Sequence, residues 1–561
     1  MTDVAKNRSL FVRNARIVDG TGGPSRRGSV AVEDGRITAV GEDVRDDAAP
    51  AGAPVLDAKG SVLAPGFIDV HTHFDPQICW DRLATPSIEH GVTTVLMGNC
   101  SLSLAPVRPD DRRALAGMFK QIEDIPLETF AAGVPWSWET YPEYLDFIRP
   151  ELGINVAGLV GHSALRHYVM GAAAQQRAAT DDEVAEMGRV LADSIRAGAA
   201  GLSTSYVDID EHMQPVASRL ATKQEIIALG RAMAEAGRGI IQTVPVFYLP
   251  QLQLQNIRDM AEISRETGLL CSVAPIVHNR DNDLWKESLA LLGDENAKGA
   301  RVFGQSMPRR FDINIRLSEA SFILLALPAW AAVMRLPLGE RLDAFRDPAR
   351  RDDLRNQAVL LGRFWDHLLV GATFTPANRS LQGRLVKDIA AERGVAPADV
   401  LLDVSCSEEL QTEFSLSGMI HADEERVTEI LNHPMIHIGA SDAGAHIAQF
   451  CGAGDTSYLL ARWVRELGAF TLERAVHRMT GELADAFGIR GRGRIEVGAA
   501  ADLVVFDPAT IDRGVEDFVH DVPGGANRYV RHATGIDTVV VNGAVVWKDG
   551  AYTAERAGEI V

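Results

Sequence analysis

The chain has 561 residues, of which 46% are hydrophobic and 24% are charged, and this ordinary globular composition excludes a disordered protein. Acidic residues outnumber basic ones by 76 to 56, which disfavours nucleic acid as a partner because its backbone is also negative. No segment is long enough to cross a membrane and the amino terminus lacks the apolar core of a signal peptide, so we expect a cytoplasmic protein with no membrane partner.

Both ends of the chain carry β-strand signals. Residues 9–19 and 29–41 alternate apolar and polar positions, and Asp34-Gly35 predicts a tight hairpin. Residues 492–508 and 534–550 repeat this pattern, with a second hairpin signal at Asn542-Gly543. We therefore expect a small composite β-domain of the sandwich type, formed by residues 1–62 and 489–561.

Residues 63–488 alternate short apolar runs with segments of helical periodicity, which is typical of βα units and a parallel sheet. The predicted fold is therefore α/β, a (β/α)8 TIM barrel, with an insertion around residues 305–400. An apolar stretch at 322–334 is expected to cap or line a pocket. Eight runs are candidate barrel strands: 62–70, 93–97, 154–160, 200–204, 239–243, 269–274, 301–304 and 435–440.

The strongest local motif is PGFIDVHTH at residues 65–73, an apolar strand that ends in His71-Thr72-His73. Residues two apart point to the same side of a strand, so both imidazoles can bind one ion at the carboxyl end, where barrel active sites lie. Asp442 follows a late strand and adds a carboxylate. Such a set leaves an open position for water, as catalytic zinc requires.

A series of motifs resembles the D-aminoacylase, or N-acyl-D-amino-acid deacylase, branch of the amidohydrolase superfamily over nearly the whole chain. The resemblance implies a barrel with a composite β-domain, zinc as the usual metal, and a cysteine ligand on the second strand, which Cys100 matches. The motifs are PGFIDVHTH (65–73), GVTTVLMGNCS (91–101), GHSALR (161–166), GLSTS (201–205), ASDAGAH (440–446) and GRIEVGAAADLVVFD (493–507).

The chain departs from the family at strands five and six, which usually end in metal-binding histidines. Here they read IIQTVP (240–245) and CSVAP (271–275), and His278 lies a few residues beyond. We therefore predict one divalent ion per chain, Zn²⁺ above all, held by His71, His73, Cys100 and Asp442, or by the two histidines and Asp442 with a water. Manganese, cobalt or iron would suit a site without the cysteine.

The other predicted site residues surround this centre. Asp442 is expected to act as general base and acid, and His162 to donate a hydrogen bond to the oxyanion. His446, Ser203 and Arg309 are weaker candidates for substrate binding or for supporting the ligands. The family's arginine after the last-strand aspartate is missing, and Arg309, Arg310 or Arg528 are its possible replacements.

The sequence thus predicts an enzyme, a metal-dependent hydrolase that cleaves a non-peptide amide bond of a small molecule and resembles the N-acyl-D-amino-acid deacylases. We also expect a homo-oligomer. Two alternatives stay open: a hydrolase of a cyclic amide, ureide or carbamate, and a degenerate, metal-free barrel that acts as a binding or regulatory protein.

Overall fold

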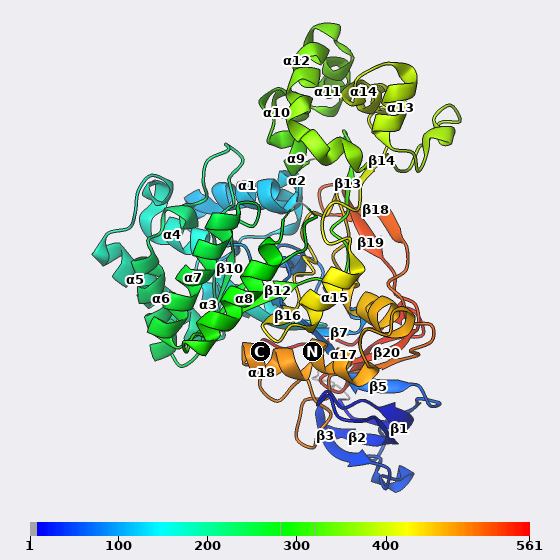
Figure 1. The fold of residues 1–561 in the computed structure, drawn as a ribbon. Helices are drawn as coiled ribbons and strands as arrows, with labels where there is room; N and C mark the ends of the chain where they lie inside the picture. The colour runs from blue at the N-terminus through cyan, green and yellow to red at the C-terminus, as the bar shows by residue number, and fades with distance from the viewer. Residues whose placement is uncertain (1–7, 281, 320) are drawn as a thin grey trace.

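The computed structural model describes residues 8–280, 282–319 and 321–561, and within them the chain forms a barrel, a β-domain and an inserted subdomain (Figure 1). The β-domain and the insertion lie on opposite sides of the barrel in this view. No helix in these ranges is both long and apolar enough to cross a bilayer.

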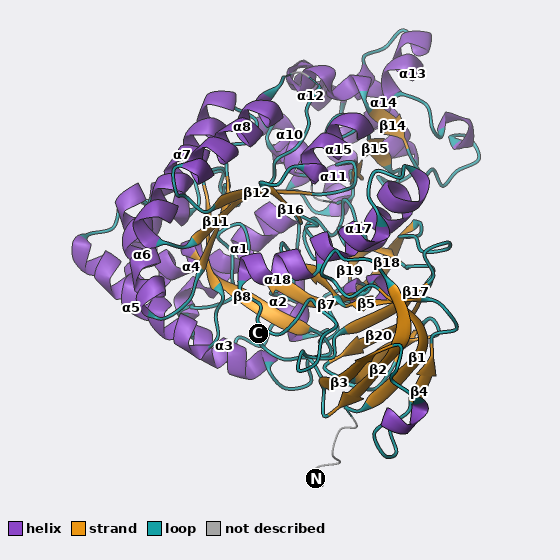
Figure 2. Ribbon diagram, turned by 60° about the horizontal axis from the view of Figure 1, so that its bottom comes forward, coloured by secondary structure: helices purple, strands orange, loops and turns teal. Residues whose placement is uncertain are grey.

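Strands from both ends of the chain form one nine-stranded sheet, shown in Figure 2. Strand β5 joins the two halves because it pairs with β1 on one side and with β17 on the other. The expected composite β-domain is present, with its strands linked in a single sheet. Its strands are β1 (Leu10–Ile17), β2 (Arg26–Glu33), β3 (Arg36–Gly41), β4 (Val55–Asp57), β5 (Val62–Pro65), β17 (Leu503–Phe506), β20 (Ile536–Val541), β21 (Ala544–Lys548) and β22 (Ala551–Tyr552).

Both predicted hairpins are confirmed. Asp34 and Gly35 join β2 to β3 with φ angles of 49° and 81°, and Asn542 and Gly543 join β20 to β21 with 47° and 83°. Two successive residues with positive φ are what a two-residue type I′ turn requires, and Asn, Asp and Gly tolerate that conformation best.

The described residues also form an eight-stranded parallel sheet that confirms the expected barrel and all eight predicted strands. A bridge between Thr72 and Ala443 joins the first strand to the segment after the last. The barrel strands are β6 (Phe67–Asp69), β7 (Val92–Met97), β8 (Asn155–Gly161), β9 (Gly201–Ser205), β10 (Ile240–Val244), β11 (Leu270–Val273), β12 (Val302–Ser306) and β16 (Ile436–Ile438).

The predicted run 62–70 divides at Gly66 between the two sheets, since β5 belongs to the β-domain and β6 to the barrel. A Cβ atom at Gly66 would lie 2.2 Å from the side chain of Thr93, so only glycine fits this close crossing.

Helices cover the outside of the barrel, and residues that face outward from the strands, such as Val95, Leu202 and Ile241, pack against them. Thr180 and Thr222 cap α5 and α6, accepting hydrogen bonds from the backbone of Glu183 and Glu225. The helices outside the insertion are α1 (Arg112–Glu123), α2 (Leu127–Gly133), α3 (Tyr141–Ile148), α4 (His162–Met170), α5 (Asp181–Ala197), α6 (Lys223–Glu235), α7 (Pro250–Thr267), α8 (Leu284–Ala297), α15 (Glu424–Asn432), α16 (Asp455–Tyr458), α17 (Leu472–Met479) and α18 (Gly481–Phe487).

The insertion between β12 and α15 is a subdomain with its own buried core, from Ile313 to Leu416, so it extends beyond the expected boundary at residue 400. A β-hairpin of β18 (Glu516–Val522) and β19 (Ala526–Arg531) lies at its base in Figure 1. The insertion comprises β13 (Ile313–Ile315), α9 (Phe322–Leu325), α10 (Pro328–Met334), α11 (Leu338–Arg346), α12 (Pro348–Ala358), β14 (Leu368–Val370), α13 (Val386–Arg393), α14 (Pro397–Ser407) and β15 (Phe414–Leu416).

Candidate active site

Two imidazoles converge just beyond the carboxyl end of β6. The backbone nitrogen of Thr72 donates to Leu96 O at 3.0 Å, and that of His73 donates to Ala443 O at 2.7 Å, so the chain stays extended past Asp69. His71 and His73 consequently point to the same side, as the alternation of a strand predicts. Both side chains are buried.

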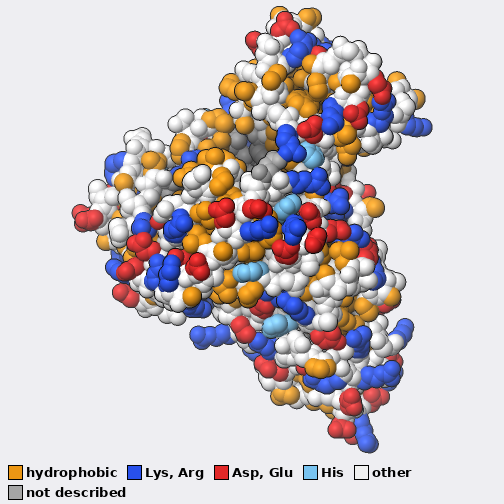
Figure 3. Space-filling model, in the orientation of Figure 1, with side chains coloured by type: hydrophobic (Ala, Val, Ile, Leu, Met, Phe, Trp, Pro, Cys, Tyr) orange, Lys and Arg blue, Asp and Glu red, His pale blue; other side chains and the backbone are white. Residues whose placement is uncertain are grey.

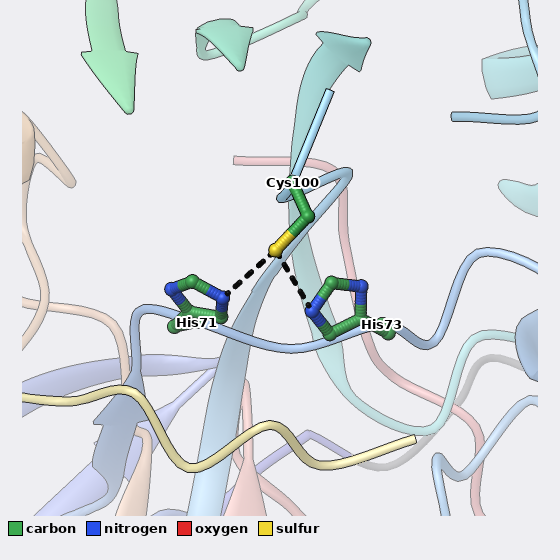
Figure 4. A group of neighbouring side chains, drawn as sticks. All are labelled: His71, His73 and Cys100. Atoms are coloured by element: carbon green, nitrogen blue, oxygen red, sulfur yellow. Dashed lines mark hydrogen bonds between the residues drawn. The ribbon is translucent and has the colours of Figure 1, made fainter. Parts of the chain in front are cut away.

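Cys100 reaches the same point from the loop after β7. Its Sγ lies 3.6 Å from Nε2 of His71 and 3.6 Å from Nε2 of His73 (Figure 4). The side-chain amide of Asn99 anchors the loop by donating to Thr72 O and Leu96 O. Cys100 itself has a φ of 55°, an unfavourable conformation for this residue that is typical of functional sites.

Asp442 completes the group from the segment after β16. Its Oδ1 lies 3.2 Å from Nε2 of His71 and 3.7 Å from Nε2 of His73. The backbone nitrogen of Asp442 donates to His71 O at 3.1 Å, which ties this segment to the histidine strand. Asp442 also has a positive φ, of 55°.

These separations fit a metal ion. Tetrahedral Zn²⁺ with bonds of about 2.0 to 2.3 Å keeps its ligand atoms roughly 3.3 to 3.8 Å apart. The separations of the two imidazoles from Cys100 and from Asp442 fall between 3.2 and 3.7 Å, but Asp442 lies outside the group in which all donor atoms are within 4.8 Å of one another. Among the described residues, His71, His73 and Cys100 form the one cluster whose donor atoms lie close enough to share an ion.

The far nitrogen of each imidazole also has a partner, as in known metal sites. Glu123 Oε1, at the end of α1, lies 3.0 Å from Nδ1 of His73, and both side chains are 1% exposed. The side-chain amide of Gln242, on β10, lies 3.2 Å from Nδ1 of His71. The amide nitrogen of Gln242 is the atom that faces the ring; with an ion on Nε2, Nδ1 would keep its proton, and the amide would accept it after turning its oxygen toward the ring.

Burial controls the charges in this group. It lowers the pKa of His71 to about 4 and also lowers that of His73, so both rings are neutral and ready to bind a cation. Burial, reinforced by surrounding carboxylates such as Glu123, raises the pKa of the Cys100 thiol well above its usual value. Burial also disfavours the charge of Asp442, but contacts with His73 and His71 outweigh it and lower the pKa.

The cluster opens into a cavity of about 660 Å³ between the barrel and the insertion. His71, His73, Cys100 and Asp442 all line it, and so does the apolar stretch 322–334 through Ile323, as expected from the sequence. A concave, mainly apolar site with a few converging polar groups is typical of small-molecule binding.

Comparison with known proteins assigns the chain to a family. The model of the amidohydrolase family matches residues 54–547. The chain belongs to the amidohydrolase family. It is 33% identical over 558 residues to a D-aminoacylase of Alcaligenes xylosoxydans xylosoxydans, covering 98% of this chain and 97% of the relative.

Two solved structures extend the likeness over 98% of each chain. One is a D-aminoacylase described with a binuclear metal centre, one-metal activation and second-metal attenuation, at 29% identity and a TM-score of 0.66. The other is the N-acyl-D-glutamate deacylase of Bordetella bronchiseptica with zinc and a phosphonate mimic of the tetrahedral intermediate, at 28% and 0.65. This protein is therefore a metal-dependent amidohydrolase of the D-aminoacylase branch, acting on carbon–nitrogen bonds other than peptide bonds.

His162, expected at the oxyanion, is not brought to the cavity of this amidohydrolase. It begins α4 and is fully buried, with Nδ1 3.1 Å from Thr204 Oγ1 and Nε2 2.9 Å from Glu225 Oε1. Arg166 also binds Glu225. Since both ring nitrogens are occupied, His162 serves to anchor α6 to the barrel, which corrects its expected contact with substrate.

The arginine candidates are placed elsewhere too. Arg309 is buried, lies 3.1 Å from Asp455 and donates to Ser441 O, and it does not line the cavity. Arg528 binds Asp521 and Thr85 away from the cavity, and Arg310 is likewise outside the lining. The expectation that one of them receives a substrate carboxylate is therefore corrected.

Of the weaker candidates, His446 lines the cavity and Ser203 does not. His446 Nδ1 lies 3.0 Å from Asp124 Oδ2, whose hydrogen bond and charge outweigh burial and raise the pKa of the ring. Ser203 is fully buried on β9.

Strands β10 and β11 present apolar side chains where the family usually has histidines. Val244 and Ala274 line the cavity there, next to the three-residue cluster. His278 is turned away, stacked edge-on against Trp285, and its backbone nitrogen donates to His421. The described residues that end β10 and β11 hence offer no imidazole for a second ion.

The sequence alone did not identify several residues of the site. Glu123, Gln242 and Asp208 lie at or beside the cluster, and no local motif marks them. Arg363, from the insertion, is the one arginine or lysine among the described residues that line the cavity. Glu123 ends the helix after β7, and only the structure shows that this acidic end is buried against His73.

Proposed function

We propose that the protein removes the acyl group from an N-acylated amino compound with a single Zn²⁺ ion bound by His71, His73 and Cys100. The observation that carries the proposal is this donor set, spaced for one tetrahedral ion and open to a substrate-sized cavity. The deacylase activity named for two relatives supports the choice of an acyl amide.

A bound divalent ion polarises the scissile carbonyl and lowers the pKa of a water, which makes hydrolysis possible near neutral pH. Asp442, ionised and 3.2 Å from Nε2 of His71, accepts the proton of the water and returns it to the leaving nitrogen. Glu123 and Gln242 hold the two rings with Nε2 turned toward the centre. His446, whose pKa is raised by its contact with Asp124, lines the cavity and donates a hydrogen bond to negative charge on the substrate.

The apolar ends of β10 and β11 favour one ion over two. A second divalent cation beside Val244 and Ala274 would lose hydration without gaining ligands, and such burial of charge is unfavourable by many kcal/mol. The metal-free alternative explains neither the spacing of the three donor atoms nor the partners on the far nitrogens.

Zinc binding is expected to release one proton more from the wild type than from the Cys100→Ser variant near neutral pH. The raised pKa of the Cys100 thiol keeps its proton in the empty site, whereas a bound thiolate has none. Isothermal titration calorimetry in buffers of different ionisation enthalpy measures the difference. Equal proton release by the two proteins would mean that Cys100 stays a thiol and is not a ligand.

Hydrolysis is tested directly with metal-stripped protein to which zinc is returned. We expect zinc to restore hydrolysis of N-acyl-D-amino acids, with slower turnover of the L-enantiomers and of a hydantoin, since the two similar deacylases are named for N-acyl-D-amino acids. Faster cleavage of the hydantoin would favour the cyclic-amide alternative. Zinc bound at one ion per chain without cleavage of any amide would contradict the proposal.

A further inference from the structure

The cavity continues from the metal ligands to the insertion, and its character changes along the way. The floor carries the acidic residues Glu123, Asp208 and Asp442 together with the imidazoles. The walls are apolar on both sides: the barrel contributes Val244, Ala274 and Met307, and the insertion contributes Ile323, Leu361 and Phe364. One end therefore suits a polar reacting group, and the other suits a hydrocarbon.

Large hydrophobic side chains are also exposed where this cavity meets solvent. Phe247 and Tyr248, which follow β10, are 36% and 61% exposed, and Leu360 on the insertion is 76% exposed. All three line the cavity. Figure 3 shows hydrophobic side chains gathered on the facing parts of the barrel and the insertion. Apolar surface of this kind usually marks a place that a ligand or partner covers.

The size of the cavity limits what its apolar part can hold. At about 660 Å³ the cavity lies within the range of about 300 to 1,000 Å³ that encloses a drug-sized ligand, which has on the order of twenty non-hydrogen atoms or more. An amide joined to an amino acid uses about eight of these atoms. On the order of twelve positions then remain along the apolar walls.

We propose that the substrate carries a long, unbranched acyl chain, near dodecanoyl in length, which lies between the barrel and the insertion; this inference rests on the proposed deacylase function. The acyl half is assigned to the apolar walls because its carbonyl oxygen is the one polar atom that it contains. The amine half carries the polar atoms and stays at the floor beside Asp442 and His446.

Leu360 and its neighbour Val359 provide a matched pair of variants. They are 76% and 74% exposed on the same segment, but only Leu360 lines the cavity. A glutamate at either position adds the same charge with little risk to folding, because neither side chain is buried. A difference in activity between the Leu360→Glu and Val359→Glu variants therefore reports contact between residue 360 and the acyl chain in the cavity.

The experiment measures kcat/KM for acetyl, butanoyl, octanoyl and dodecanoyl derivatives of one D-amino acid. Each added methylene is expected to raise kcat/KM by about fourfold until diffusion limits it, since burying a methylene is worth about that factor. Leu360→Glu should lower the ratio of dodecanoyl to acetyl kcat/KM by about tenfold, and Val359→Glu should leave it unchanged. Rates independent of chain length, or equal effects of the two variants, overturn the proposal.

A binding measurement separates this inference from the function on which it rests. Dodecanoate, below its micelle concentration, is titrated calorimetrically into zinc-free protein, with acetate as the comparison. Tight binding of dodecanoate that Leu360→Glu weakens and Val359→Glu does not supports an acyl cavity even if no amide is cleaved. Absence of that binding overturns the inference even if short N-acyl amino acids are hydrolysed. The exposed hydrophobic side chains would then be covered by something else, such as a second copy of the protein.

Discussion

Replacement of both His71 and His73 by alanine is expected to remove the bound metal and to lower kcat/KM by at least about 10³-fold, because polarisation of the carbonyl and activation of water are both lost. Two of the three clustered donors disappear, and Cys100 and Asp442 alone cannot complete a tetrahedral site. Elemental analysis of the purified protein gives the metal content, and hydrolysis of the best N-acyl substrate gives the rate.

His162→Asn is the control for this experiment, since His162 is also a buried histidine but its ring nitrogens bind Thr204 and Glu225 outside the cavity. Circular dichroism shows whether each variant is folded. We expect the control to keep about one metal per chain. A double variant that retains its metal places the ligands elsewhere, and a folded His162→Asn variant with metal but no activity would restore the catalytic role expected from the sequence.

The sequence predicted the barrel and the hairpins because their signals are local. A strand of a buried parallel sheet is an apolar run of limited length, and a type I′ turn needs two residues that tolerate positive φ, as Asn542-Gly543 does. Closure of the barrel then brings the carboxyl ends of the strands together. His71, His73 and Asp442 could be placed near one another for that reason alone, while Cys100 came from the family resemblance.

Residues beyond the strand ends were less predictable, because the two-residue alternation that fixes the direction of side chains along a strand stops where the strand ends. His162 is the first residue of α4 and turns outward to Glu225 on α6 instead of inward. Glu123 reaches His73 from the last turn of α1, 50 residues further along the chain, and only the packing of that helix brings the pair together.

The insertion illustrates the same limit on a larger scale. Its hydrophobic residues were legible as an apolar stretch, but a pattern of apolar residues does not distinguish a buried core from the wall of a cavity. Leu324 and Ile323 are neighbours, yet Leu324 is fully buried in the core of the insertion and Ile323 lines the cavity. The substrate preference depends on that division, so it could be inferred only from the structure.

Asp442→Asn is expected to keep the metal and to lose about 10² to 10⁴-fold in kcat/KM, which is the usual contribution of a general base. Asparagine has nearly the shape of aspartate and can still contact His71 and His73, while His71, His73 and Cys100 remain as ligands. It cannot accept the proton of the attacking water or return one to the leaving nitrogen. Rate and metal content, measured on the same sample, therefore show whether Asp442 acts as a general base or as a metal ligand.

Asp208→Asn is the matched control, because Asp208 also lines the cavity and is half-buried like Asp442, but among the described residues it forms no ion pair with the two ligand histidines. Its rate should stay within about tenfold of the wild type, since only a nearby charge is removed. If Asp442→Asn loses the metal, Asp442 acts chiefly as a ligand. If Asp208→Asn has the larger effect on rate with metal retained, the base is Asp208, and Asp442 serves to position the imidazoles.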